Sequence, residues 1–350
     1  MKRIIKIGEY ETGLLNNICD VEGVSVGHFT IDKDNIQTGL TVILPHQDNL
    51  FQNKVVSASY VYNGFGKSLG LVQIDELGII ETPIVLTNTL SVGKVSDGLI
   101  SYMLKDNKEI GRSASTVNSV VLECNDGSIN DIQTRAIEEE HLFNAINTAT
   151  KDFECGSVGA GRGMKCHGFK GGIGSSSRII NIGSETYTIG VLVNSNFGSS
   201  NGSDLIIKGR QMGPLIKDYE LEKLEDQGSI IVVIATDLPL DSRQLKRVCK
   251  RAELGIARTG SYAGNGSGDI MVAFSTKNIV TNSAPCEKIL RFSDSYINIV
   301  FKAVVDATEE AVLNSMFYAT KVKGYNNITY KTLDEYINLY KDLLLDNKVL

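Results

Sequence analysis

The sequence has no tryptophan, only five prolines and only four histidines among its 350 residues. No apolar run approaches the ~18 residues of a membrane-spanning helix. Lys6 and Glu9 interrupt the apolar stretch at residues 1–9, so we expect that this stretch is not a secretory signal peptide. A basic excess is also missing, since the net charge is −6. We therefore expect neither a nucleic acid nor a membrane as partner.

Metal-binding and disulfide patterns are absent as well. The six cysteines form no CxxC pair, so we expect buried, reduced thiols in a cytoplasmic protein. The histidines form no HExxH or HxH motif, and we expect neither a metal nor another cofactor. A Ser-His-Asp triad with His28 or His167 remains open, although GxSxG is absent.

Glycine, in contrast, is abundant, with 34 residues. Gly66-Lys67-Ser68 resembles the end of a phosphate-binding loop, but Val61 stands where the first glycine is needed. A dinucleotide-binding fingerprint in residues 156–174 fails at Met164. Flexible linkers seldom contain apolar residues at the density of this segment. We therefore interpret residues 156–174 as an ordered loop whose backbone closely approaches another part of the chain.

Periodicity predicts alternating strands and helices in one core. Residues 199–228 lose this pattern and contain the acidic run 218–226, so we expect an exposed, partly disordered connector there. Both sides of the connector resemble parts of one core, which predicts a single domain over residues 1–350. Strands are expected at 38–45, 81–93, 117–122, 188–198, 230–235 and 270–276, and helices at 95–103, 134–152, 242–258, 298–319 and 333–345.

The junction Gly228-Ser229 places a small nucleophile between the connector and a buried strand. It is either a plain strand start or a site where the chain cuts itself. Hydrolysis without histidine needs another base, and the α-amine of a new N-terminal serine has a reference pKa of ~7.7–8. Gly228 would permit the strained geometry of self-attack, and the connector could then move away.

Two other segments offer partners for such a serine. Ser267 could relay a proton to its amine and Asp269 could orient that hydroxyl, while Asn196 ends a strand with an amide free to donate to an oxyanion. Residues 123–127 also follow a strand, and they fit either a site or an Asn-Asp-Gly turn. Residues 264–268 are likewise a good turn sequence.

These segments together resemble the L-aminopeptidase/D-esterase and β-peptidyl aminopeptidase group, the DmpA family, over roughly residues 14–325. The landmarks are residues 18–28, 81–84, 87–89, 123–127, 156–174, 196–198, 228–229, 265–269 and 310–314. The resemblance implies a four-layer αββα sandwich, as in ornithine acetyltransferases. It also implies autocatalytic cleavage into an α chain, 1–228, and a β chain, 229–350, and tetramers of the processed heterodimer.

The resemblance further assigns roles to single residues. It implies that Ser229 is the nucleophile and that Ser267 and Asp269 support it, although some members have glutamate in place of Asp269. It places Asn196 in the oxyanion hole. The remaining positions concern the substrate, because Glu123 would hold its free amine and Asn125 would line the same pocket.

Three functions are consistent with these observations. The first is a self-processing serine aminopeptidase that releases N-terminal residues, including D- or β-amino acids, from peptides, amides or esters. The second is an acyl transferase of the ornithine acetyltransferase type, against which Ser229 argues because those enzymes use threonine at the cut. The third is an unprocessed binding protein with residues 156–174 as its pocket. The sequence does not distinguish substrate side chains.

Overall fold

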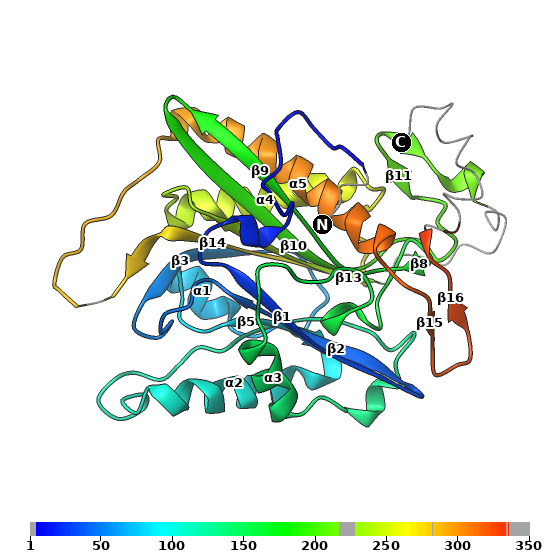
Figure 1. Ribbon diagram of the computed structural model, residues 1–350, viewed down its shortest axis with the longest axis horizontal. Helices are drawn as coiled ribbons and strands as arrows, with labels where there is room; N and C mark the ends of the chain where they lie inside the picture. Colours follow the sequence, from blue (N-terminus) through cyan, green and yellow to red (C-terminus); the bar gives the residue numbers. More distant parts are fainter. Residues whose placement is uncertain (1–4, 217–227, 282, 334, 336–350) are drawn as a thin grey trace.

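Two β-sheets form the centre of the molecule (Figure 1). The structure is a computed structural model that describes residues 5–216, 228–281, 283–333 and 335. The four-stranded sheet has the order β1 (Ser25–Lys33), β2 (Ile36–Leu44), β5 (Ile84–Asn88), β6 (Val120–Cys124). The six-stranded sheet has the order β4 (Ile79–Ile80), β3 (Lys54–Gly64), β14 (Gly268–Val280), β13 (Ser229–Thr236), β10 (Glu185–Asn196), β9 (Gly172–Ile182).

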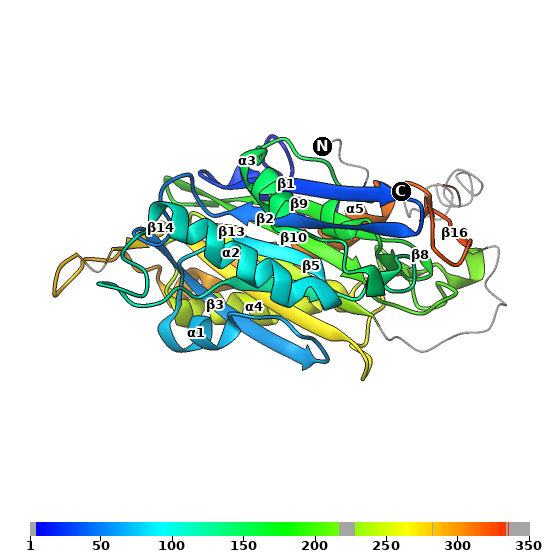
Figure 2. The ribbon, with the colours of Figure 1, turned by 90° about the horizontal axis from the view of Figure 1, so that it is seen from below.

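Helices cover the outer face of each sheet, which gives four layers (Figure 2). Alternate strand residues such as Leu122 and Ile231 fill the space between the sheets. Their neighbours face outward onto helices, as Val121 does toward Leu99 and Val232 toward Leu245. The predicted αββα sandwich is confirmed. Helices α2 (Val92–Asp106) and α3 (Glu139–Asn147) pack on the four-stranded sheet, and α4 (Ser242–Ala257) and α5 (Ile297–Phe317) pack on the six-stranded sheet. The short helix α1 (Leu71–Leu77) contacts β3 and β4 of the six-stranded sheet.

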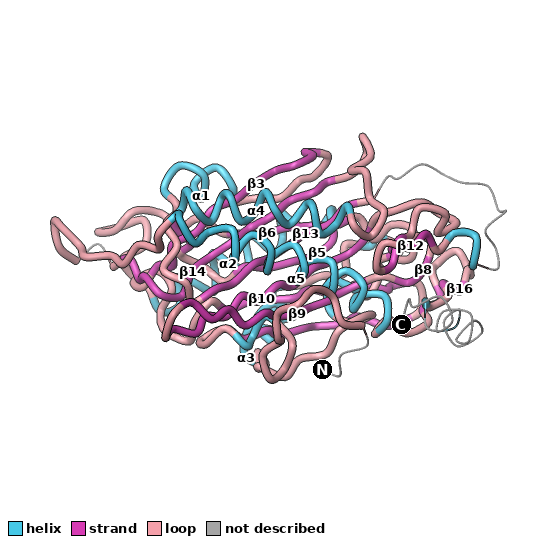
Figure 3. Tube along the Cα trace, turned by 90° about the horizontal axis from the view of Figure 1, so that it is seen from above, coloured by secondary structure: helices cyan, strands magenta, loops and turns pink. Residues whose placement is uncertain are grey.

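The strands of both sheets run roughly along the long axis of the molecule (Figure 3). Within the described ranges, no helix is both long enough and apolar enough to cross a membrane. The remaining strands pair as β7 (Lys165–Cys166) with β8 (Phe169–Lys170), β11 (Ile206–Ile207) with β12 (Arg210–Gln211), and β15 (Val322–Lys323) with β16 (Thr329–Tyr330).

Most predicted elements form where the sequence indicates them. The helix α4 begins after Asp241, whose carboxylate accepts a hydrogen bond from the Gln244 N–H at 2.7 Å. The helix predicted at 134–152 is shorter and occupies only Glu139–Asn147. It starts late because Arg135 adopts a left-handed backbone with φ 49° after a 3₁₀ turn.

The strand β9 was not predicted, because its first half consists of glycine and serine. Ser175, Ser176 and Ser177 are fully buried. Their hydroxyls are satisfied by Val191 O, Ala307 O and the Asp20 carboxylate, each at 2.6 Å. Buried polar side chains with such partners are compatible with a core strand, but periodicity of apolar residues does not reveal them.

The expected exposed connector is wrong for residues 199–216. Leu205, Ile207, Met212 and Ile216 are buried in the core between the six-stranded sheet and its helices. Only Ile207 lies in the hairpin β11–β12, and the four residues are spaced too irregularly for a periodicity argument. The acidic run 218–226 and almost all of the predicted helix at 333–345 lie outside the described residues.

Helix α5 is in direct backbone contact with β9. A Cβ atom at Gly174 would lie 1.9 Å from Ala311 O, so only glycine fits there. Arg178 of β9 and Glu310 of α5 form a buried ion pair with 2.8 Å between Nη2 and Oε2. Asn314 adds a hydrogen bond to Ser175 O at 2.9 Å. These contacts hold the outer helix on the sheet that carries Ser229.

The close contact predicts that Gly174→Ala destabilises the protein by about 1–3 kcal/mol, because the new methyl group has no space. Thermal unfolding should show a lower midpoint. The control is Gly93→Ala in α2, where no atom lies within 4 Å of the added Cβ. That variant should unfold at the same or a higher temperature, since alanine favours helix by about 0.5–1 kcal/mol over glycine. Equal midpoints for both variants would contradict the contact.

Candidate active site

Three adjacent inner strands of the six-stranded sheet bring several predicted site residues together at one end of the sheet, which is called the Ser229 edge. Asn196, the last residue of β10, pairs with Ser229, the first residue of β13. Ser229 in turn pairs with Gly268, the first residue of the parallel strand β14. Because β10 runs opposite to the other two, its carboxyl end lies beside their amino ends.

Ser229 is 6% exposed and lies on the strand face that fills the space between the sheets, as Ile231 does. The neighbouring Gly268 leaves room beside its hydroxyl. A Cβ atom at position 268 would lie 3.3 Å from Ser229 Oγ and 2.7 Å from Phe65 O. The glycine therefore keeps the space around the candidate nucleophile open.

The carbonyl group of Gly228 is hydrogen-bonded within this edge. Its oxygen accepts a bond from the Gly268 N–H at 3.3 Å, which draws electron density from the carbon that precedes Ser229. Glycine is needed for a steric reason, because a Cβ atom would lie 1.9 Å from Asn196 O.

Ser267 and Asp269 are directly connected, as the sequence predicts. The Ser267 hydroxyl donates to Asp269 Oδ1 at 2.7 Å, and both residues are almost fully buried. The Asn63 amide donates to Ser267 O at 2.7 Å and to Gly264 O at 2.8 Å, which fixes the preceding loop. No motif in the sequence indicates this role of Asn63, which is the residue before the last one of β3.

Asn196 is held from both sides rather than free. Its Nδ2 donates to Asn125 O at 3.0 Å, and its Oδ1 accepts from the Lys165 N–H at 3.0 Å. One amide hydrogen remains without a partner among the described residues. Lys165 belongs to the glycine-rich segment 156–174, and this segment is the ordered, closely packed loop that was predicted.

Glu123 reaches the site from β6 of the other sheet. The Cys124 Sγ donates to Asn194 O at 3.5 Å, which places the end of β6 over the end of β10. The Glu123 carboxylate accepts from the Lys67 N–H at 2.7 Å and from the Thr89 hydroxyl. A Cβ atom at Gly66 would lie 3.4 Å from Glu123 Oε1 and 3.9 Å from Gly268 Cα. The carboxylate is therefore close to the strand edge that carries Ser229.

Residues 123–127 form the turn that their sequence predicts. The Asn125 side chain accepts from the Gly127 N–H at 2.9 Å, so the segment is an Asn-initiated turn. The backbone carbonyl of Asn125 also accepts a hydrogen bond from the Asn196 side chain. Lys67 and Thr89, the partners of Glu123, were not predicted as site residues, because they act through a backbone N–H and a single hydroxyl.

The two histidines considered as possible bases have other neighbours in this arrangement. His28 interacts with Thr41 Oγ1 at 2.9 Å and with Glu154 O at 3.1 Å, and burial lowers its pKa to about 4. His167 packs edge-on against the Phe197 ring. Within the described ranges, neither histidine is hydrogen-bonded to Ser229. No group of three or more His, Cys, Asp or Glu side chains in these ranges could hold a metal ion.

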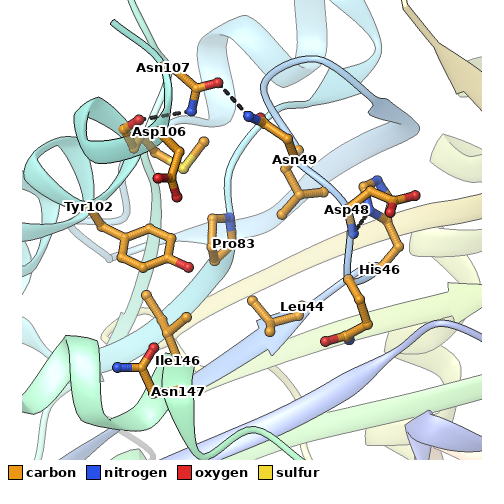
Figure 4. A pocket seen from close by; sticks show the side chains of 13 residues that line it. Leu44, His46, Asp48, Asn49, Pro83, Tyr102, Asp106, Asn107, Ile146 and Asn147 are labelled. Carbon is orange, nitrogen blue, oxygen red and sulfur yellow. Dashed lines mark hydrogen bonds between the residues drawn. The ribbon is translucent and has the colours of Figure 1, made fainter.

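A cavity of about 450 Å³ lies elsewhere, at the carboxyl ends of α2 and α3 (Figure 4). Tyr102, Asp106 and Ile146 line it, together with Pro83, which precedes β5. Glu123 lies near the opposite end of the four-stranded sheet, where β5 and β6 end. The cavity is thus separate from the edge that carries Ser229.

Known proteins resemble the chain over nearly its whole length. A family model described as peptidase family S58 matches residues 16–330. The β-peptidyl aminopeptidase BapA of Sphingosinicella microcystinivorans is 36% identical over 347 residues, which cover 92% of this chain and 86% of the relative.

Two solved structures have the same fold. The PH0078 protein of Pyrococcus horikoshii OT3 aligns with a TM-score of 0.91 and 46% identity, over 97% of this chain and 98% of the other. The L-aminopeptidase D-Ala-esterase/amidase of Ochrobactrum anthropi, a prototype for the serine aminopeptidases with a variant of the Ntn hydrolase fold, aligns with a TM-score of 0.87 and 33% identity, over 95% and 96% of the two chains. The chain therefore belongs to peptidase family S58 and is a serine aminopeptidase.

Proposed function

We propose that Ser229 is the nucleophile of this aminopeptidase and that the single domain 1–350 cuts itself before Ser229. The cut produces an α chain, 1–228, and a β chain, 229–350. One observation carries this proposal: Asn196, Ser229 and Gly268 are in register at one sheet edge, and the Gly268 N–H binds the Gly228 carbonyl oxygen. The bond to be cut is thereby held and polarised beside the serine.

Self-cleavage follows from this geometry in two steps. Ser229 Oγ attacks the Gly228 carbonyl carbon, and the acyl group moves from the Ser229 nitrogen to its oxygen. This shift breaks the Gly228–Ser229 C–N bond, and the nitrogen takes up the hydroxyl proton and becomes a free α-amine. Water then hydrolyses the ester, which releases the Gly228 carboxylate and restores the Ser229 hydroxyl. That amine is a base that titrates near neutral pH and adjoins the hydroxyl it must activate.

Peptide hydrolysis uses the same groups. The Ser229 amine accepts the hydroxyl proton, with the Ser267 hydroxyl as a relay that Asp269 orients. Serine attacks the carbonyl of the substrate's first residue, and the remaining Asn196 amide hydrogen and backbone N–H groups stabilise the oxyanion. The amine returns its proton to the leaving group, and water releases the acyl chain.

The substrate is a peptide, amide or ester with a free N-terminal amine. Glu123 is suited to bind this amine, because its buried carboxylate is close to the Ser229 edge, and Asn125 adjoins the same space. Relatives that act on β-peptidyl or D-alanyl substrates extend the proposed range to β- and D-amino acids. A cytoplasmic location is proposed as well, because the six scattered cysteines form no CxxC pair and no spacing typical of a disulfide scaffold. Tetramers of the processed heterodimer are proposed as the assembly.

Replacement of Ser229 by alanine tests the self-cleavage. Intact-mass measurement of the wild type should show two polypeptides, 1–228 and 229–350, whereas Ser229→Ala should remain one chain. Its peptidase rate should fall by roughly a thousandfold or more, since no nucleophile is left. Ser242→Ala, at the start of α4, should process normally. The proposal is wrong if Ser229→Ala still yields two chains.

Replacement of Glu123 by glutamine tests recognition of the substrate amine. The preference for free over N-acetylated substrates should fall by about 1.5–3 kcal/mol, or roughly ten- to hundredfold, because the ionic hydrogen bond is lost. The matched control is Glu81→Gln. Glu81 is equally buried but binds the Asn118 N–H and the Gln73 amide before β5, away from Ser229. An unchanged preference in Glu123→Gln would exclude this role.

A further inference from the structure

Lys170 is a fully buried lysine at the end of β8, inside the glycine-rich segment 156–174. Its Nζ donates to Gly161 O at 2.9 Å and to Gly171 O at 2.8 Å. Within the described ranges it forms no ion pair, and burial is the largest cause that lowers its pKa well below the usual range. Lysine is almost never fully buried without a charged partner, so these two bonds to backbone oxygens indicate a specific role for the amine.

The Gly161 carbonyl belongs to a tight turn that precedes β7. Its oxygen also accepts from the Met164 N–H at 3.3 Å, which closes the turn over residues 161–164. The Met164 oxygen in turn accepts from the Gly171 N–H at 3.0 Å. The Lys170 amine and these two backbone bonds therefore tie the turn to β8, the second strand of the hairpin that follows it.

Lys165, the residue after this turn, connects it to the candidate active site. Its N–H donates to Asn196 Oδ1 at 3.0 Å. An amide side chain has one acceptor oxygen and two donor hydrogens. Because the Lys165 N–H binds the oxygen, the Nδ2 group is the one that reaches Asn125 O at 3.0 Å and keeps its second hydrogen for another acceptor. Displacement of the Lys165 N–H would allow the amide to rotate and to turn its oxygen toward the oxyanion, which it would repel.

We infer that Lys170 is a positioning residue for peptide hydrolysis, whose side-chain amine holds the turn 161–164 so that the Lys165 N–H fixes the Asn196 amide. This role rests on the proposed function, since it acts through Asn196 as a donor to the oxyanion. The glycine-rich segment thereby takes part in catalysis through a backbone N–H that a buried amine keeps in place.

Self-cleavage depends on a different donor. The Gly228 carbonyl oxygen is bound by the Gly268 N–H at 3.3 Å, without a contribution from the turn 161–164. Removal of the Lys170 amine should therefore slow the peptidase reaction and leave self-cleavage complete. A general loosening of the Ser229 edge would impair both reactions instead.

Replacement of Lys170 by methionine removes both N–H donors and keeps a side chain of similar length. The kcat of the processed enzyme should fall by roughly ten- to hundredfold, while KM stays within about twofold, because a catalytic donor is misplaced and substrate binding is not. Intact-mass measurement should still show the polypeptides 1–228 and 229–350. Lys170→Gln, whose amide can bind one of the two carbonyl oxygens, should retain more of the wild-type kcat than Lys170→Met.

A double-mutant cycle with Asn196 tests the path of the effect. In the Asn196→Ala background the amide is absent, so Lys170→Met should lower kcat there by no more than about twofold. A residue that only stabilises the fold would lower kcat by the same factor in both backgrounds.

Lys54→Met is the matched control, because the Lys54 amine also donates to a backbone oxygen, that of Phe51, at the opposite end of β3 from the Ser229 edge. Its kcat should match the wild type. The inference is overturned if Lys170→Met keeps the wild-type kcat, remains one chain, or acts equally in both Asn196 backgrounds. Lys170→Gln replaces it in these comparisons if the methionine variant does not fold. Each of these outcomes is distinct from failure of the proposed function, in which Ser229→Ala would retain cleavage and activity.

Discussion

The register of β10, β13 and β14 is the constraint on which the rest of the site depends. Pairing of Ser229 with Asn196 on one side and with Gly268 on the other leaves no freedom to slide, since a shift by one residue would turn Ser229 to the opposite face. The hydrogen bond from Gly268 N to Gly228 O continues this pairing beyond the strand. Sheet geometry thus places the proposed nucleophile Ser229 beside the Gly228 carbonyl and beside the proposed amide donor Asn196.

The layers around this edge keep it rigid. Helix α5 is held on β9 by Gly174 and by the Arg178–Glu310 pair, and the glycine-rich segment supports Asn196 through Lys165. The second sheet contributes Glu123, whose carboxylate is oriented by a backbone N–H and a hydroxyl. Preorganisation of this kind matters because donors that are already oriented need not reorganise when charge develops.

The resemblance to a known family predicts the sandwich, and apolar periodicity predicts most of its helices and several of its strands, because these are local signals. The sequence predicts Ser267 with Asp269 because they are two residues apart, and their hydrogen bond is found. It does not reveal β9, whose buried serines depend on distant acceptors, nor the burial of residues 199–216. The partners of Glu123 and Asn196 were also missed, because they are backbone groups and lone polar side chains that only tertiary structure brings together.

The central claim is that a serine exposed by self-cleavage performs the peptidase reaction. Labelling of the purified wild type with a serine-reactive phosphonate, followed by peptide mass mapping, tests it most directly. The account predicts one adduct, on Ser229 as the first residue of the polypeptide 229–350, with loss of activity in proportion to labelling. An adduct on another serine, or full labelling and activity in a chain still joined at Gly228-Ser229, would contradict it.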